Sequence, residues 1–201
     1  MTDKKAILVI GAGDATGGAI ARRFAREGYI ACATRRSVDK LQPLVDQIRA
    51  DGGQAHGFGS DARKEDEMVA LIEHIERNIA PIAVAVFNIG ANVRSPITET
   101  TSRVYLKVWE IACFGGFLMG REAAKVMLPR GRGTIIFTGA TASLRGREGF
   151  AAFAGAKHAL RALAQSMARE LGPQGIHVAH TVIDGAIDTR FIAENFPERY
   201  A

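Results

Sequence analysis

Short apolar runs alternate along the chain with longer segments in which apolar residues recur every three or four positions. The segments predict helices over residues 16–27, 38–51, 64–79, 100–128 and 150–171. The runs predict strands, because each is only a few residues long and most end at a glycine or a polar residue. They occupy residues 6–10, 29–34, 55–59, 82–87, 134–138 and 176–183.

This regular alternation predicts a parallel β-sheet with helices on both faces, because each parallel crossover needs the length of a helix. The strands are apolar almost throughout, as expected for a sheet covered on both sides. We therefore expect a doubly wound α/β fold, that is, a Rossmann fold, with residues 1–201 forming a single domain. Ligands of such sheets bind beyond the carboxyl ends of the strands, so the segments that follow the strands are the candidate site.

The last predicted helix contains a lysine on its apolar side. Lys157 falls among Phe150, Phe153 and Leu160, and not on the polar face that carries Arg161. An ammonium group is costly to bury without a partner. Lys157 must therefore be paired, reach water along its aliphatic stem, or contact a ligand.

A glycine-rich loop, GAGDATGG, follows the first predicted strand and leads into the first helix. Gly11, Gly13 and Gly17 would let the backbone approach a pyrophosphate, and the helix start around Ala15 and Thr16 would offer unpaired N–H groups. The spacing departs from GxGxxG, because Thr16 stands in the place of the third glycine. A plain turn between strand and helix is the alternative interpretation.

Two arginines follow the second predicted strand. A basic side chain at this place in a nucleotide-binding sheet favours a ribose 2′-phosphate, whereas an acidic one favours the free 2′-hydroxyl. Arg35 and Arg36 therefore favour NADP(H) over NAD(H). Asp14 opposes this interpretation, since it either neutralises one of the arginines or bonds the ribose itself. A solvated helix start is the remaining alternative.

The segments after the later strands complete an ordered set of motifs. Together with FAGAK in the last helix, the set resembles the short-chain dehydrogenase/reductase family, a group of NAD(P)-dependent oxidoreductases. The resemblance runs from about Lys5 to Thr189. The motifs are SDARKEDE, FNIGANV, TGATASLRG and DGAIDT.

The resemblance covers the dinucleotide-binding motifs of the family. Its glycine motif, Thr-Gly-x-x-x-Gly-x-Gly, is matched at Gly11 and Gly17, with Ala15 in the middle glycine place. By the same resemblance, Asp61 is the acidic residue that contacts the adenine ring.

Two further segments match the dinucleotide-binding motifs of the family. The resemblance implies that Asn88 to Gly90 closes the cofactor cleft and that Thr189 lies near the nicotinamide carboxamide. Gly185 matches the Pro-Gly-x-x-x-Thr segment of the family, and Asp184 replaces its proline.

The catalytic residues of the family are matched at one position of four. The family uses an Asn, a Ser, a Tyr and a Lys, of which the tyrosine moves the proton while the lysine bonds the nicotinamide ribose. Lys157 matches the lysine. Phe153, Ala140 and Ala112 stand in the places of the Tyr, the Ser and the Asn. We expect Lys157 to bind cofactor with or without a neighbouring tyrosine.

Substitutes for the missing polar groups are present nearby in the sequence. Thr141 and Ser143 are our candidates for bonding a substrate oxygen, although hydroxyls in loops often cap the next turn instead. Asp184 is either a base or a partner of the turn backbone. His177 and His180 belong to the last predicted strand, and we interpret both as core histidines with satisfied hydrogen bonds.

Composition narrows the remaining classes of function. Lys and Arg number 26 against 21 Asp and Glu, for a net charge of +5, but the basic residues are scattered, which does not indicate a nucleic-acid surface. Cys32 and Cys113 lie in apolar runs without the spacing of metal ligands, so we expect buried thiols and no metal site. The apolar runs are too short to span a membrane, and we expect a cytoplasmic protein.

The sequence thus predicts an NADP(H)-dependent oxidoreductase that moves a hydride to or from a small carbonyl, alcohol or activated alkene without a tyrosine. The alternative is a catalytically inactive dinucleotide-binding sensor or partner subunit. We also expect a homo-oligomer, a dimer or tetramer, through the helix that carries Tyr105 and Trp109. Family members usually continue well past the place of Thr189, whereas twelve residues follow it here. The sequence therefore does not identify the substrate.

Overall fold

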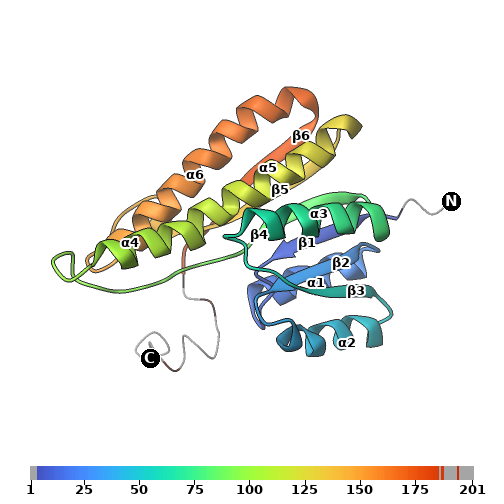
Figure 1. The fold of residues 1–201 in the computed structure, drawn as a ribbon, viewed down its shortest axis with the longest axis horizontal. Helices are drawn as coiled ribbons and strands as arrows, with labels where there is room; N and C mark the ends of the chain where they lie inside the picture. Colours follow the sequence, from blue (N-terminus) through green and yellow to red (C-terminus); the bar gives the residue numbers. More distant parts are fainter. Residues whose placement is uncertain (1–3, 186, 188–193, 195–201) are drawn as a thin grey trace.

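The computed structural model describes residues 4–185, 187 and 194 (Figure 1). Six strands form one parallel sheet in the order β3-β2-β1-β4-β5-β6, which confirms the predicted doubly wound Rossmann fold. All six predicted strands are confirmed, with ends shifted by no more than two residues. They are β1 (Ala6–Ile10), β2 (Ile30–Arg35), β3 (Gln54–Gly59), β4 (Ile82–Phe87), β5 (Gly133–Ala140) and β6 (Ile176–Ile183).

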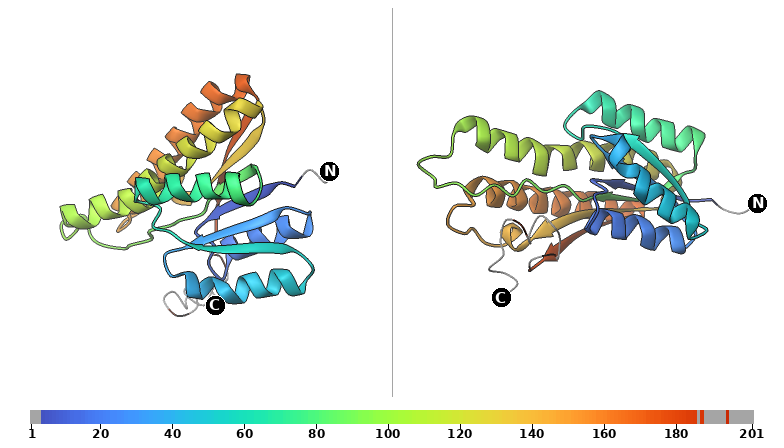
Figure 2. Two further views of the ribbon diagram at one scale, coloured as in Figure 1. Left: turned by 45° about the vertical axis from the view of Figure 1, so that its right-hand side comes forward. Right: turned by 90° about the horizontal axis from the view of Figure 1, so that it is seen from below.

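Helices cover both faces of the sheet (Figures 1 and 2). On one face lie α1 (Thr16–Arg26) and α2 (Gln42–Ala50), the latter preceded by the short helix η1 (Val38–Leu41). On the other face lie α3 (Glu65–Asn78), α5 (Gly115–Met127) and α6 (Ala151–Leu171). Short 3₁₀ turns, η3 (Leu128–Arg130), η4 (Thr141–Ser143) and η5 (Gly172–Gln174), follow α5, β5 and α6.

The helix predicted over residues 100–128 is interrupted. It comprises α4 (Ser102–Trp109), a π-helical turn η2 (Glu110–Phe114) and α5. The hydrophobic periodicity does not reveal the π turn, because one extra residue per turn changes the pattern over too short a span. The turn contains Ala112 and Cys113, which pack against Ala152 and Ala156 of α6, so that α4 and the start of α6 lie side by side.

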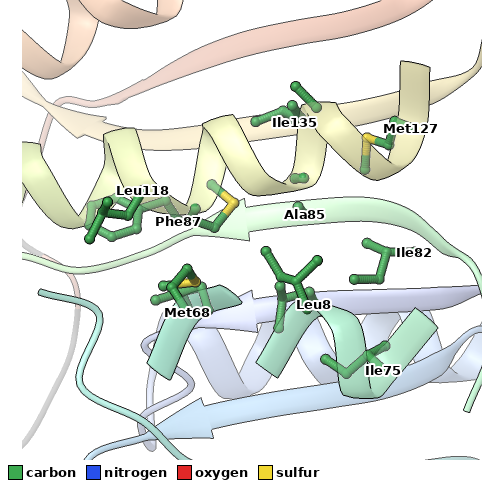
Figure 3. Close-up of a cluster of buried hydrophobic side chains, with 14 of the residues drawn as sticks. Leu8, Met68, Ile75, Ile82, Ala85, Phe87, Leu118, Met127 and Ile135 are labelled. Carbon is green, nitrogen blue, oxygen red and sulfur yellow. The ribbon is translucent and has the colours of Figure 1, made fainter. Parts of the chain in front are cut away.

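Two apolar layers hold the sheet between its helices. The larger layer lies beneath α3, α5 and α6, where side chains of the strands meet those of the helices (Figure 3). Phe87 and Ile135, from β4 and β5, are fully buried there against Leu118 of α5. The smaller layer packs Ile7 and Val9 of β1 and other residues against α1 and α2. No helix among the described residues is long and apolar enough to cross a membrane.

The two histidines of β6 do not behave as predicted. His177 is exposed, because β6 is an edge strand and alternate side chains face outward. His180 faces α6, and its buried Nε2 has no hydrogen-bond partner among the described residues. Burial lowers the pKa of His180, and the positive charges of Lys157 and Arg161 lower it further. The prediction of satisfied core histidines is therefore wrong for both residues.

Gly139 provides the space for the His180 ring. A methyl group at Gly139 would overlap the ring and lie 2.5 Å from the backbone oxygen of Thr181. We expect Gly139→Ala to lower the free energy of unfolding by about 1 to 3 kcal/mol, the usual cost of overpacking. Urea denaturation measures this change. Gly59→Ala is the matched control, since a methyl group there would make its closest contact at 3.5 Å, in ordinary van der Waals range. An equal loss in both variants would contradict the packing argument, whereas a smaller loss for Gly139→Ala in a His180→Ala background would support it.

Candidate dinucleotide and active site

The candidate site lies where the order of the strands reverses. β1 is flanked by β2 and β4, so the chain leaves β1 and β4 toward opposite sides of the sheet. The loops at the carboxyl ends of such a pair leave a crevice between them. The segments singled out by sequence follow β1, β2, β3, β4, β5 and β6, and thus lie along this one edge.

The glycine loop is held between α1 and β4 at very short range. A methyl group at Gly17 would overlap the carbonyl oxygen of Gly11 and lie 2.8 Å from the Cα of Ala12. The side chain of Asn88 donates from Nδ2 to the same carbonyl of Gly11 at 3.1 Å. Gly17 therefore allows the start of α1 to cross directly over the end of β1, and Asn88 fixes that crossing to β4.

The start of α1 has the features of an anion site. The N-cap residue Ala15 makes no side-chain cap, and the first turn, from Thr16 onward, contains no acidic residue. Nothing among the described residues lies within 4 Å of the position that a Cβ on Gly13 would take, so the loop is open there. Uncapped N–H groups and the positive end of the helix dipole suit a pyrophosphate. The loop thus fits the dinucleotide that the fold implies.

The end of β2 carries both arginines, but one of them is already paired. Nη1 of Arg35 lies 3.2 Å from Oδ1 of Asp14, whose side chain is 90% exposed. Arg36 is exposed beside it. Of the two roles that the sequence left open for Asp14, the structure contains the neutralising contact with Arg35.

Asp61 is paired within its own turn after β3. Its carboxylate accepts from Nε of Arg63 at 2.8 Å, and its N–H donates to Oε2 of Glu67 at 2.7 Å. The hydrogen bond from Arg63 lowers the pKa of Asp61, and the charge of Arg36 lowers it further. Sequence reasoning missed Arg63, although an arginine two residues after an aspartate is placed to bond it across a short turn.

Lys157 is buried and paired with the backbone. It is 3% exposed, and its Nζ donates to the carbonyl oxygens of Ile89, after β4, at 3.0 Å and of Thr138, in β5, at 2.9 Å. Burial lowers its pKa to about 8, against a smaller raising effect of Cys113. The ammonium therefore does not reach water, and two carbonyl groups stabilise it. No sequence signal identifies these carbonyls, because any residue supplies one.

The positions that resemblance assigns to the missing catalytic groups lie around Lys157. Phe153 is one helical turn before it, with its ring centroid 5.9 Å from Nζ. Ala140 ends β5, two residues after the carbonyl of Thr138 that Lys157 binds. Ala112 is fully buried in η2, in the same apolar cluster as Phe153. These three positions are therefore apolar, whereas Cys113 and His180 also lie close enough to interact with the charge of the ammonium.

The two hydroxyl candidates have different surroundings. Ser143 is fully buried, and its Oγ accepts from the N–H of Ala140 at 3.1 Å, a local cap of the turn. Thr141 donates its hydroxyl to Oδ1 of Asp184, which joins the loop after β5 to the loop after β6. Sequence reasoning named both residues without pairing them.

The remaining candidates are more exposed or lie outside the described residues. Gly90 and Gly185 are exposed, and no described atom lies within 4 Å of a Cβ at either position. Thr189 falls outside the described residues. His158, the neighbour of Lys157 in α6, is exposed and contacts the carbonyl oxygen of Ala154 in its own helix. No group of three or more His, Cys, Asp or Glu side chains in the described part of the chain could hold a metal ion.

Comparison with known proteins agrees with this architecture. The short chain dehydrogenase profile matches residues 5–199. The chain belongs to the short-chain dehydrogenase family. As a member it is an oxidoreductase of the short-chain type, and its cofactor is a nicotinamide dinucleotide, NAD(P)(H).

Individual members of the short-chain dehydrogenase family resemble the chain over most of its length. The short-chain dehydrogenase/reductase eriH of Hericium erinaceus is 30% identical over the whole chain and 81% of its own length. A crystal structure of a short-chain dehydrogenase from Rhodopseudomonas palustris is 52% identical, with a TM-score of 0.87, and covers 98% of this chain and 91% of its own. Actinorhodin polyketide ketoreductase with NADPH is 27% identical, with a TM-score of 0.91, over 98% of this chain and 77% of its own. Across several curated relatives, the chain spans 60% to 81% of their length.

The lowered pKa of Lys157 predicts a measurable dependence of stability on pH. The unfolded lysine keeps its proton up to about pH 10.5, whereas the folded one loses it near pH 8. Between these values the unfolded state binds more protons, so this group makes the protein more stable as the pH rises. The free energy of unfolding of the wild type, relative to Lys157→Met, should therefore increase by roughly 2 to 3 kcal/mol from about pH 7 to about pH 10.

Urea denaturation at a series of pH values measures this difference. Lys40→Met, at an exposed lysine of η1, is the matched control and should follow the wild type. The loss of the two carbonyl contacts in Lys157→Met adds an offset that does not depend on pH. Parallel curves for the wild type and Lys157→Met would show that the folded lysine titrates normally.

Proposed function

We propose that this protein is an NADP(H)-dependent oxidoreductase that transfers a hydride to or from a small carbonyl, alcohol or activated alkene without a catalytic tyrosine. The observation that carries the proposal is the position of Lys157. Its ammonium lies at the ends of β4 and β5, with two donors bound to carbonyl groups and a phenylalanine one turn before it. An ammonium has three donors, so one remains for the hydroxyls of the nicotinamide ribose.

We assign the dinucleotide to the residues that follow the strands. The loop after β1 would bind the pyrophosphate, and Arg35 and Arg36 would bind the 2′-phosphate. Asp61 would lie at the adenine, with Asn88 and Gly90 at the closing side of the cleft, and Gly185 and Thr189 at the carboxamide. The loop residues so assigned are Gly11, Gly13, Asp14, Ala15, Thr16 and Gly17, which would bind the phosphates through backbone N–H groups and not through the Asp14 carboxylate.

The bound nicotinamide would supply the hydride, and the chain would supply position and polarity. We place Phe153, Ala140 and Ala112 where the family has its Tyr, Ser and Asn, so no side chain at these positions exchanges a proton. An activated alkene suits such a site, because its reduction can take a proton from water. Thr141 is the hydroxyl that we assign to the substrate oxygen: while it donates to Asp184 it can accept from a substrate alcohol, and it would have to turn from Asp184 to donate to a carbonyl. Ser143 positions the turn that carries it.

A second candidate function is dinucleotide binding without turnover, as a sensor or as a partner subunit. The apolar surroundings of Lys157 favour it, because a positioned acid or base is worth about 10² to 10⁴ in rate and none of the three replaced positions offers one. Association also fits this candidate. Tyr105, Leu106 and Trp109 are exposed on α4, and we propose this surface as the contact of a homo-oligomer, a dimer or tetramer. We place either function in the cytoplasm, on the strength of the two free buried thiols.

The first test of the proposed function is cofactor binding. We expect NADPH to bind more tightly than NADH, because only the 2′-phosphate draws on Arg35 and Arg36. Titration followed by nucleotide fluorescence gives both dissociation constants. Arg36→Gln should weaken NADPH and leave NADH unchanged, and Arg23→Gln on α1 is the control for the loss of one exposed arginine. Equal affinity for both nucleotides would refute the NADP(H) assignment, and binding of neither would refute the site.

The second test restores the missing catalytic groups. Phe153→Tyr with Ala140→Ser should raise the rate of reduction of a reactive aldehyde, such as nitrobenzaldehyde, by at least about tenfold, since a general acid commonly contributes more. Steady-state oxidation of NADPH measures the rate. Phe150→Tyr with Ala140→Ser is the matched control, because Phe150 is the N-cap residue of α6, two turns before Lys157, whereas Phe153 lies one turn before it. If the restored protein and the control have the same rate and the same affinity for NADPH, these residues do not face the reacting atoms.

A further inference from the structure

We propose that Asp14 lowers the preference for NADP(H) by competing with its 2′-phosphate for Arg35. The inference rests on the proposed function and refines it. It is carried by the ion pair between Asp14 and Arg35, which joins the loop after β1 to the end of β2 across 21 residues of sequence.

The backbone brings these two side chains together. β1 and β2 are parallel neighbours with Ile10 opposite Thr34. The N–H groups of Gly11 and Ala12 then both donate to the carbonyl oxygen of Thr34, at 3.2 Å and 2.9 Å. These bonds hold the start of the glycine loop against the end of β2, immediately before Arg35. The pair is therefore a consequence of how the loop leaves the sheet.

The pair lies at the surface, where a ligand can displace it. Arg35 is 31% exposed and Asp14 is 90% exposed, and Arg35 is the only partner of the Asp14 carboxylate among the described residues. An exposed ion pair contributes little free energy, because water and salt screen it. A phosphate dianion can thus exchange with Asp14, but Asp14 weakens its binding by occupying the guanidinium and by repelling the phosphate.

The other charges nearby do not replace this effect. Arg36 is exposed and adds positive charge, and Asp61 is bound to Arg63 through its carboxylate. Asp14 is therefore the carboxylate that directly offsets an arginine at the end of β2. NAD(H) carries a free 2′-hydroxyl, which is neutral and therefore does not compete with Asp14 for an ion pair with Arg35. Asp14 consequently reduces the preference for NADP(H) below the level that two arginines would produce.

The test uses Asp14→Asn and two ligands that differ only in the phosphate of interest. Adenosine 2′,5′-bisphosphate carries the 2′-phosphate, 5′-AMP lacks it, and neither contains the nicotinamide. Calorimetry should show that Asp14→Asn binds the bisphosphate about two- to fivefold more tightly than the wild type, as expected for the loss of an exposed charge contact. Affinity for 5′-AMP should be unchanged. The gain should shrink when the salt is raised from about 0.05 M to about 0.5 M.

A matched control removes the same charge elsewhere. Asp46→Asn, on the exposed side of α2, should leave the affinity for the bisphosphate within the error of the wild type. An equal gain in Asp46→Asn would assign the effect to net charge and overturn the role of Asp14. Weaker binding of 5′-AMP by Asp14→Asn would show that Asp14 instead bonds the ribose, which also overturns the proposal.

The outcomes separate this inference from the proposed function. If the wild type binds the bisphosphate more tightly than 5′-AMP and Asp14→Asn binds it equally well, the competition is refuted while the NADP(H) site stands. If the wild type binds neither ligand, the dinucleotide site itself is refuted, and the inference with it.

Discussion

The contacts of one buried ammonium organise the part of the candidate site at the ends of β4 and β5. Lys157 donates from α6 to the carbonyl oxygens of Ile89 and Thr138, so a single side chain connects the last long helix to the ends of β4 and β5. A charge in this position is costly unless its hydrogen bonds are made, and here the backbone makes two of them. The cost explains both the lowered pKa and the fixed position of the group. The rest of the candidate site is arranged around that fixed charge.

The side chains of Phe153, Ala140 and Ala112 near Lys157 are apolar. Ala112 lies in the π turn η2 and packs into the apolar cluster between α4 and α6 that also contacts Phe153. Cys113, in the same turn, is buried as well, and burial raises the pKa of its thiol. The hydrogen bond from Thr141 to Asp184 lies beyond this cluster and joins the loops that follow β5 and β6.

The dinucleotide half depends on close backbone contacts combined with a compensated set of charges. Gly17 lets α1 cross over Gly11, and the side chain of Asn88 fastens the crossing to β4. The arginines after β2 lie among carboxylates that partly neutralise them. Asp14 offsets Arg35 and Arg63 offsets Asp61, so Arg36 contributes the charge that no described carboxylate binds directly. The net charge at the end of β2 is consequently a balance of exposed groups that salt can screen.

The sequence by itself determined the fold and the order of the motifs along one sheet edge. Alternation of apolar runs with helical periods is a local property, and the run lengths alone placed every strand within two residues. The glycine loop and the lysine on an apolar stripe were likewise visible, because each violates the pattern expected of an ordinary turn or helix.

Only the tertiary structure decided which polar atoms meet. The carbonyl partners of Lys157, the pairing of Thr141 with Asp184 and the ring of His180 over Gly139 join positions from 19 to 68 residues apart. The hydrophobic periodicity of the sequence does not predict these contacts, because every residue has a carbonyl group and a hydroxyl can bond many different partners. Sequence therefore placed the candidate residues along one edge, and packing determined what each one binds.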